Sequence, residues 1–368
     1  MIHLKRLSLL AGGILVLGLL TLALLPSPID PAAYEPAPGP ALSGLLEPNE
    51  ALRTAEVLAR DLAHGPEDVD VDPQGRIVAG LEDGRILRLT PRAGGGYRSE
   101  TWVETGGRPL GLAFSPDGSL WIADARKGLL SVDPEGRIQV RATQAEGLPF
   151  GFTDDLDVAS DGTVYFSDAS SRYGVDEYLY DLLEARPHGR LLAYRPGGGP
   201  VRVLLDGLYF ANGVALARNE DFVLVNETYR YRILRYWLKG PRAGTSEVFL
   251  DALPGFPDGV SANRQGVFWV ALFTVRNPMV DRLHPRPWAK SLLAKLPKAL
   301  WPKPAPYGLV LAVNENGRIL ASLHDPGGET VRQITSAQQQ GRSLLLGNLS
   351  GYGIGRWEVP EELSEPQP

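Results

Sequence analysis

Four oxygen-bearing side chains recur at one position of a repeated pattern in this chain of 368 residues. Each precedes a short apolar segment, as Asn212 does in "FANGVAL" and Asp258 does in "FPDGVSA". The aligned residues of six copies are Glu67, Leu110, Asp154, Asn212, Asp258 and Thr335. Converging carboxylates repel one another and raise each other's pKa unless a cation holds them. Because hard oxygen ligands suit Ca²⁺ better than Zn²⁺, the set predicts a calcium site. Alternatively, each residue caps its own strand through a turn hydrogen bond.

The elements that must position these side chains repeat along the chain. Each copy has a short alternating strand, a polar turn and a second β-rich strand, and third and fourth strands follow. The copies are residues 65–81, 108–124, 152–168, 210–226, 256–272 and, more weakly, 334–349. Their turns are spaced 43 to 59 residues apart. Four strands at this period, six times over, predict an all-β, six-bladed β-propeller whose first strands line a central channel.

The two ends of this repeat region predict how the ring closes. The last copy finishes with a third-strand segment, residues 353–359, and no fourth strand follows it. Residues 54–62, "TAEVLARDL", resemble the fourth strand "TSEVFLDAL" of residues 245–253. We therefore expect one blade to be stitched from both termini (velcro closure), which leaves no open sheet edge.

The N-terminus predicts a membrane anchor. Lys5 and Arg6 precede nineteen uncharged residues, Leu7–Leu25, which as a helix span about 28 Å, close to one hydrocarbon core. A cleaved signal peptide is the alternative. The positive flank stays cytoplasmic, so the soluble part is expected on the periplasmic or extracytoplasmic side. The expected organisation is an anchor or signal segment at 1–25, a Pro-rich linker at 26–44, the propeller at 45–360 and a tail at 361–368.

Composition narrows the chemistry. The net charge of −6 gives no case for nucleic-acid binding by the surface as a whole, so we expect no nucleic-acid partner. Cysteine is absent, which excludes disulfides, thiolate metal sites and cysteine nucleophiles.

Longer stretches resemble a known family. "GLYFANGVAL" (207–216), "YFSDASSRY" (165–173) and "YGLVLAVNENGRILASLHDP" (307–326) are similar to strictosidine synthase-like proteins, within a six-bladed group that includes paraoxonases and gluconolactonases. The resemblance covers about residues 45–360. It implies calcium in the central channel, with Glu67, Asp154, Asn212 and Asp258 as the matching ligands. Asp154 departs from the family pattern, in which asparagine is usual.

The resemblance also implies a reaction class. In gluconolactonase-type relatives the matching aspartate serves as base, which here is Asp258, and Asp155 is a second candidate. Asp155 has a structural alternative, a buried carboxylate bonded to backbone amides. The paraoxonase histidine is replaced by Leu110, and no acid lies near Thr335, where strictosidine synthases carry their catalytic glutamate. We therefore expect a calcium-dependent hydrolase of a small-molecule ester or lactone, without strictosidine synthase activity. The alternative is a non-catalytic, calcium-stabilised platform for a ligand or a protein.

Two insertions are expected beside the pocket, which Leu110, Phe152, Tyr173 and Thr335 are predicted to line. Residues 171–189 form either an aromatic wall over the channel or a packed loop. From Arg276 to Lys303, seven Lys or Arg residues stand against one acid, Asp281, and are interleaved with tryptophan and leucine. That composition predicts an interfacial segment on anionic lipid, and the alternative is a helical insertion that packs its apolar face on the blades.

Overall fold

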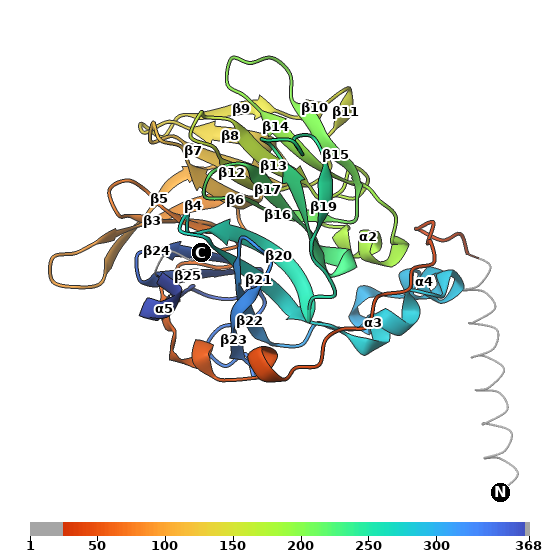
Figure 1. Cartoon of the computed structure of the whole chain (residues 1–368). Coiled ribbons are helices and arrows are strands. Elements are labelled where there is room, and N and C mark those ends of the chain that lie inside the picture. Colours follow the sequence, from red (N-terminus) through yellow and green to blue (C-terminus); the bar gives the residue numbers. More distant parts are fainter. Residues whose placement is uncertain (1–24, 365–368) are drawn as a thin grey trace, which may run out of the picture.

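The computed structural model describes residues 25–364, and its strands form six four-stranded sheets within this range. The sheets are arranged around an axis (Figure 1). The six-bladed, all-β propeller is therefore confirmed. Five blades are built from consecutive antiparallel strands. Their strands are β2 (Val69–Val71), β3 (Ile77–Gly80), β4 (Arg85–Pro91) and β5 (Tyr97–Glu104); β6 (Pro109–Phe114), β7 (Leu120–Asp124), β8 (Gly128–Val132) and β9 (Ile138–Ala142); β12 (Thr153–Val158), β13 (Val164–Asp168), β14 (Gly189–Tyr194) and β15 (Arg202–Leu208); β16 (Ala211–Leu216), β17 (Phe222–Glu227), β18 (Arg232–Trp237) and β19 (Ser246–Leu250); and β20 (Gly255–Ala262), β21 (Val267–Val275), β22 (Gly308–Asn314) and β23 (Ile319–Asp325).

The sixth sheet contains strands from distant parts of the sequence. It combines β24 (Ile334–Gln340), β25 (Ser343–Asn348) and β26 (Ile354–Glu358) with β1 (Glu56–Leu58). Strand β1 runs antiparallel to β26, with Val57 opposite Gly355. A small hairpin, β10 (Gln144–Ala145) and β11 (Leu148–Pro149), lies outside the six sheets.

Apolar side chains of neighbouring blades form the core. The largest cluster joins β16–β19 to β20–β23 through Phe222, Phe268 and Leu311, all almost inaccessible to solvent. The turns after the inner strands need a left-handed residue. Gly75, Gly118 and Gly162 fill that position at φ +77°, +84° and +80°.

Short helices lie at the side of the propeller where the inner strands begin. They are α2 (Tyr178–Glu184), between β13 and β14, and α3 (Pro278–Leu283), α4 (Pro287–Ala294) and η4 (Lys298–Leu300), between β21 and β22. We call these four elements the lid. The other short helices are η1 (Gly44–Leu46), η2 (Ala51–Thr54), η3 (Thr228–Arg230) and α5 (Glu361–Ser364).

Residues 29–37 of the expected linker, which we call the strap, are extended and packed on the lid (Figure 1). Ile29 is 4% exposed in a cluster with Leu183 of α2, Ala294 of α4 and Trp301. The backbone N–H of Ala32 donates to the Glu184 carbonyl at 2.8 Å, and the Lys290 ammonium donates to the Ala32 carbonyl at 2.5 Å. The linker is therefore part of the folded structure from Ile29 onwards.

The expected transmembrane helix, Leu7–Leu25, lies outside the described residues except for Leu25. Within residues 25–364, no helix has the length and apolar character needed to cross a membrane.

Candidate functional site

The four predicted ligands meet on the propeller axis, each near the start of an inner strand. Glu67 precedes β2, whereas Asp154, Asn212 and Asp258 lie within β12, β16 and β20. All four side chains are buried, with exposed fractions of 4 to 9%. Glu67, Asp154 and Asn212 line both cavities of the channel, and Asp258 lines the cavity under the lid. The repeat therefore brings the predicted set together.

A recurring β-bulge positions these residues. In β12, three residues advance from Thr153 to Leu156 against two on β13, and β16, β20 and β24 show the same extra residue. A bulge bends the strand and redirects its side chains. Here the unpaired stretches contain Asp154, Asn212, Asp258 and Thr335.

Glycine follows two of the ligands because the next inner strand lies too close for a side chain. A Cβ on Gly213 would approach the Val260 nitrogen to 2.4 Å and the Asp258 carbonyl oxygen to 2.5 Å. A Cβ on Gly259 would approach the Thr335 carbonyl oxygen to 2.4 Å. The dipeptides Asn-Gly and Asp-Gly are therefore the sequence signature of this close approach.

Three buried carboxylates share the site without a compensating contact for every oxygen. Burial, and next the charge of Asp258, raises the pKa of both Glu67 and Asp154 well above the usual range. Burial raises the pKa of Asp258 to about 7, although the Asn212 amide donates to its Oδ1 at 2.8 Å. Asp154 Oδ2 is buried with no hydrogen-bond partner.

These residues fit a hard cation. They offer carboxylate and amide oxygens without sulfur or imidazole, and Asp154, which lines the channel, has a buried oxygen without a hydrogen-bond partner. Within residues 25–364, no group of three or more acidic or histidine side chains already stands close enough to form a metal centre. The residues that would hold the cation are Glu67, Asp154, Asn212 and Asp258.

Residues outside the predicted set hold the site in place. The Asn226 amide donates to the Asp258 carbonyl at 2.5 Å, and the Thr228 hydroxyl donates to the Pro257 carbonyl at 2.7 Å. The buried Arg108 guanidinium bonds to the carbonyls of Gly65 and Leu349, and its charge partly offsets the raised pKa of Glu67. None of these residues aligns with the four predicted ligands in the repeat, so the repeat did not predict that they contribute to the site.

The cavity on the lid side of the carboxylates, which we call the apolar pocket, has a volume of about 190 Å³. Its floor contains Glu67, Asp154, Asn212 and Asp258. Its walls and roof include Leu110, Phe152, Tyr178, Phe210, Tyr229, Phe256, Phe273, Val280, Pro302 and Pro304. Three carboxyl groups and an amide thus lie at the base of a chamber whose walls are mostly apolar.

The predicted pocket residues divide between several locations. Leu110 and Phe152 line the apolar pocket. Tyr173 does not, because its ring packs on Tyr180 and His188 and its hydroxyl donates to Glu184 beneath the strap. Tyr178 of the same insertion lines the apolar pocket. Thr335 faces the other side of the channel, and its hydroxyl donates to the Glu67 carbonyl at 2.6 Å.

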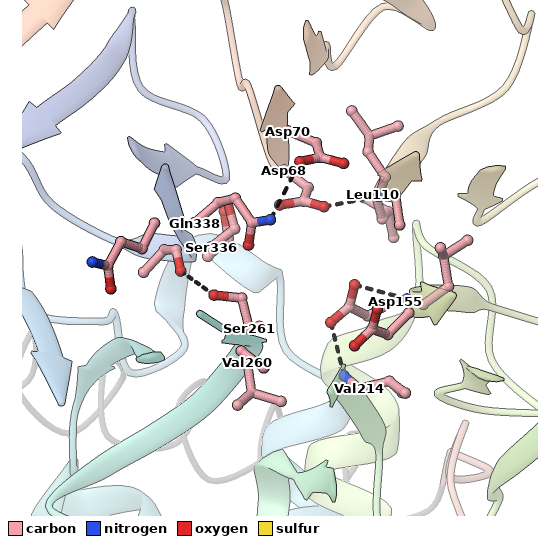
Figure 2. A pocket seen from close by; sticks show the side chains of 18 of the residues that line it. Asp68, Asp70, Leu110, Asp155, Val214, Val260, Ser261, Ser336 and Gln338 are labelled. Carbon is pink, nitrogen blue, oxygen red and sulfur yellow. Dashed lines mark hydrogen bonds between the residues drawn. The ribbon is translucent and has the colours of Figure 1, made fainter. Parts of the chain in front are cut away.

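A second cavity of about 300 Å³, the polar pocket, lies beyond the carboxylates and is shown in Figure 2. It contains Asp155, whose Oδ1 accepts from the Leu156 amide and whose Oδ2 accepts from the Val214 amide, both at 2.8 Å. Asp68 joins blades in the same way by accepting from the Leu112 amide. Burial raises the pKa of Asp155 to about 7. These contacts match the structural alternative for Asp155, a buried carboxylate bonded to backbone amides.

A six-bladed propeller with an acidic centre at the mouths of its inner strands defines a broad class, and sequence comparison identifies the family. Residues 154–241 match the family described as "Strictosidine synthase", and residues 44–89 match "Strictosidine synthase-like, N-terminal". The chain is 38% identical over 328 residues to the human "Adipocyte plasma membrane-associated protein", covering 84% of this chain and 79% of the relative. It is 36% identical over 348 residues to "Protein STRICTOSIDINE SYNTHASE-LIKE 10" of Arabidopsis thaliana, covering 86% and 93%. The chain therefore belongs to the strictosidine synthase-like family.

Solved structures support the fold. A gluconolactonase from Xanthomonas campestris superposes with a TM-score of 0.61 at 18% identity, covering 92% of this chain and 99% of that one. Regucalcin from Agrobacterium tumefaciens, a calcium-binding protein, gives a TM-score of 0.55 at 17% identity, covering 83% and 93%.

Proposed function

We propose that this protein is a calcium-dependent hydrolase of apolar esters or lactones. The observation that carries the proposal is the placement of three buried carboxylates and Asn212 on the floor of the apolar pocket. The unpartnered Asp154 Oδ2 supports a cation there. Lactonase and calcium-binding relatives of the fold are consistent with this chemistry, although fold by itself does not define activity.

Bound calcium, Asp258 and Asn212 have different roles in the proposed hydrolysis. Bound calcium would supply polarisation of the ester carbonyl and stabilisation of the oxyanion. Asp258 is the base that takes a proton from water as the water oxygen bonds to the acyl carbon. The C–O bond to the leaving group then breaks, and the leaving oxygen takes the proton that Asp258 received, which regenerates the base. Asn212 orients Asp258 through its amide hydrogen bond at 2.8 Å.

The walls of the apolar pocket set the substrate class. Phe152, Phe210, Tyr229 and Phe256 offer apolar surface and few hydrogen-bond partners. A polyhydroxylated sugar lactone would leave its hydroxyl groups unpaired there, which costs about 1–3 kcal/mol for each buried group. An aromatic or alkyl substituent fits the same walls.

Purified full-length protein, assayed with phenyl acetate and an alkyl lactone, tests the proposal. Chelation with EDTA should abolish turnover, added calcium should restore it, and Asp258→Asn should lose it with the fold intact. Gluconolactone serves as the polar control and should be a poor substrate. Turnover that survives both EDTA and Asp258→Asn contradicts the proposal.

One observation favours a second candidate, a non-catalytic calcium-stabilised platform. Leu110 and Thr335 occupy positions at which relatives carry catalytic side chains, and the Thr335 hydroxyl donates its hydrogen bond to the Glu67 carbonyl. In that case EDTA lowers the melting temperature and no substrate of the panel is turned over.

We also propose that the protein is membrane-anchored through residues 7–25, with the propeller on the periplasmic or extracytoplasmic side. The apolar run Leu7–Leu25 and its positive flank support this orientation. Relatives named as plasma membrane-associated are consistent with it. Alkaline extraction of membranes and protease protection of the intact cells or vesicles test the anchor and its orientation.

A further inference from the structure

The outer face of the lid exposes large apolar side chains. Met279 of α3 is 59% exposed, Trp288 of α4 is 67% exposed and Leu300 of η4 is 66% exposed. Single exposed apolar residues are common on soluble proteins. Here three lie on consecutive elements of one insertion, and one of them is a tryptophan, the residue that prefers the membrane interface.

Cations are interleaved with these apolar residues in the sequence. Of the seven Lys and Arg residues from Arg276 to Lys303, two face inward, because Arg276 bonds to the Leu253 and Ala37 carbonyls and Lys290 bonds to Ala32. The only acid of the segment, Asp281, accepts a hydrogen bond from the Tyr231 hydroxyl at 2.8 Å. The exposed cations are Arg282, Arg286, Lys298 and Lys303.

The strap limits how far Leu25, the last residue of the apolar N-terminal run, can lie from the lid. Leu25 is 52% exposed and ends the run Leu7–Leu25, while Ile29 is already packed against α4. The two positions are four apart in the sequence, a reach of at most about 14 Å. A bilayer that receives this run would therefore lie beside the lid.

We propose that the outer face of the lid docks on an anionic bilayer, with Met279, Trp288 and Leu300 at the headgroup level and the four exposed cations on lipid phosphates and carboxylates. The inference rests on the proposed anchor and is independent of hydrolase activity. Val280, Pro302 and Pro304 belong to the same insertion and line the apolar pocket. A lipid-soluble ligand would thus reach the carboxylates directly from the membrane.

Tryptophan quenching in vesicles tests the docking. Full-length protein is reconstituted into phosphatidylcholine vesicles with about 30% phosphatidylserine and with brominated acyl chains, which quench nearby indoles. The chain has seven tryptophans, so Trp288→Phe isolates the signal of Trp288. We expect the difference in emission between wild type and Trp288→Phe to fall at least twofold in brominated vesicles relative to unbrominated ones.

Charge reversal tests the role of the cations. The variant Arg282→Glu, Arg286→Glu, Lys298→Glu, Lys303→Glu should lose this quenching in vesicles with phosphatidylserine, because each cation near an anionic surface changes partitioning about fivefold. The matched control reverses four exposed arginines on the opposite face, namely Arg92, Arg195 and Arg342 between strands and Arg202 at the start of β15. The control should remain quenched, and both variants should melt like the wild type.

Two results overturn the inference. In the first, Trp288 is not quenched by brominated lipid, which leaves the lid face for a protein partner. In the second, the two charge-reversed variants are quenched equally. An inactive protein whose Trp288 is quenched would refute only the proposed hydrolysis.

Discussion

The contact between the fourth and fifth inner strands allows a sharp test of how the site is built, through Gly213→Ala. The added Cβ would lie 2.4 Å from the Val260 nitrogen, 2.5 Å from the Asp258 carbonyl oxygen and 2.7 Å from the Asn226 amide nitrogen. Two of these neighbours are backbone atoms, so relief requires the strands to move apart. The displaced residues include Asn212 and Asp258, both predicted ligands.

The expected cost of Gly213→Ala has two parts. Overpacking a well-packed site costs about 1–3 kcal/mol, and loss of the Asn226–Asp258 hydrogen bond costs about 1 kcal/mol. The free energy of unfolding should therefore fall by about 2–4 kcal/mol. At about 2 °C per kcal/mol for a chain of this size, the melting temperature should fall by about 4–8 °C.

Calorimetry with and without calcium measures both effects of Gly213→Ala. The variant should melt earlier and should need more calcium for the same thermal stabilisation. Gly174→Ala is the matched control, because its Cβ meets only the Gly151 carbonyl oxygen at 3.8 Å. If Gly213→Ala melts within about 1 °C of the wild type and binds calcium equally well, the strands are not held as closely as described.

Three further predictions address the acids and the strap. Burial raises the pKa of Asp181 to about 7, so its contribution to stability is present below about pH 4 and is lost as the pH rises to about 7, by at most about 4 kcal/mol. Asp181→Asn should flatten this decline in urea unfolding from pH 4 to 8, and an unchanged profile would contradict the assignment. Asp155→Asn should lose about 1–3 kcal/mol of unfolding free energy, because the Val214 amide loses its acceptor. This variant should keep calcium-dependent turnover, whereas Asp258→Asn should lose it. Equal losses of turnover in the two variants would refute these separate roles. A chain that begins at Leu45 should be cut by protease within residues 275–308 faster than one that begins at Leu25, because it lacks the strap, and equal rates would show that the strap does not hold the lid.

The repeat made the fold and the set of four side chains predictable. Alternating strands and turns at a regular period specify blades, and side chains at equivalent positions of inner strands must converge on the axis. The bulge that redirects them was not predicted, although the glycines after Asn212 and Asp258 carried its signal. Those glycines are required by the distance to the next strand, which only the assembled ring defines.

The parts of the site that escaped prediction depend on contacts between distant segments. Asn226 and Thr228 act on residues about thirty positions later, and Arg108 bonds to Gly65 and Leu349, which lie 43 and 241 positions away in the sequence. The strap is a proline-rich segment without a hydrophobic period, and such sequences are typical of linkers. Its docking rests on a few contacts, such as Ile29 in the cluster with Leu183 and Ala294, which no local pattern encodes.

The arrangement of acids along the channel separates structural from functional carboxylates. Asp68, Asp70, Asp155 and Asp157 each accept backbone amides from their own strand and from the neighbouring blade, and thereby stitch two pairs of inner strands together. Glu67, Asp154 and Asp258 lie one layer closer to the lid, and Asp154 keeps a buried oxygen without a partner. Burying an unpaired charge costs several kcal/mol unless a proton or a cation compensates it. A cation would therefore bind more favourably at Glu67, Asp154 and Asp258 than at the four aspartates that already accept backbone amides. The first three acids also line the apolar pocket.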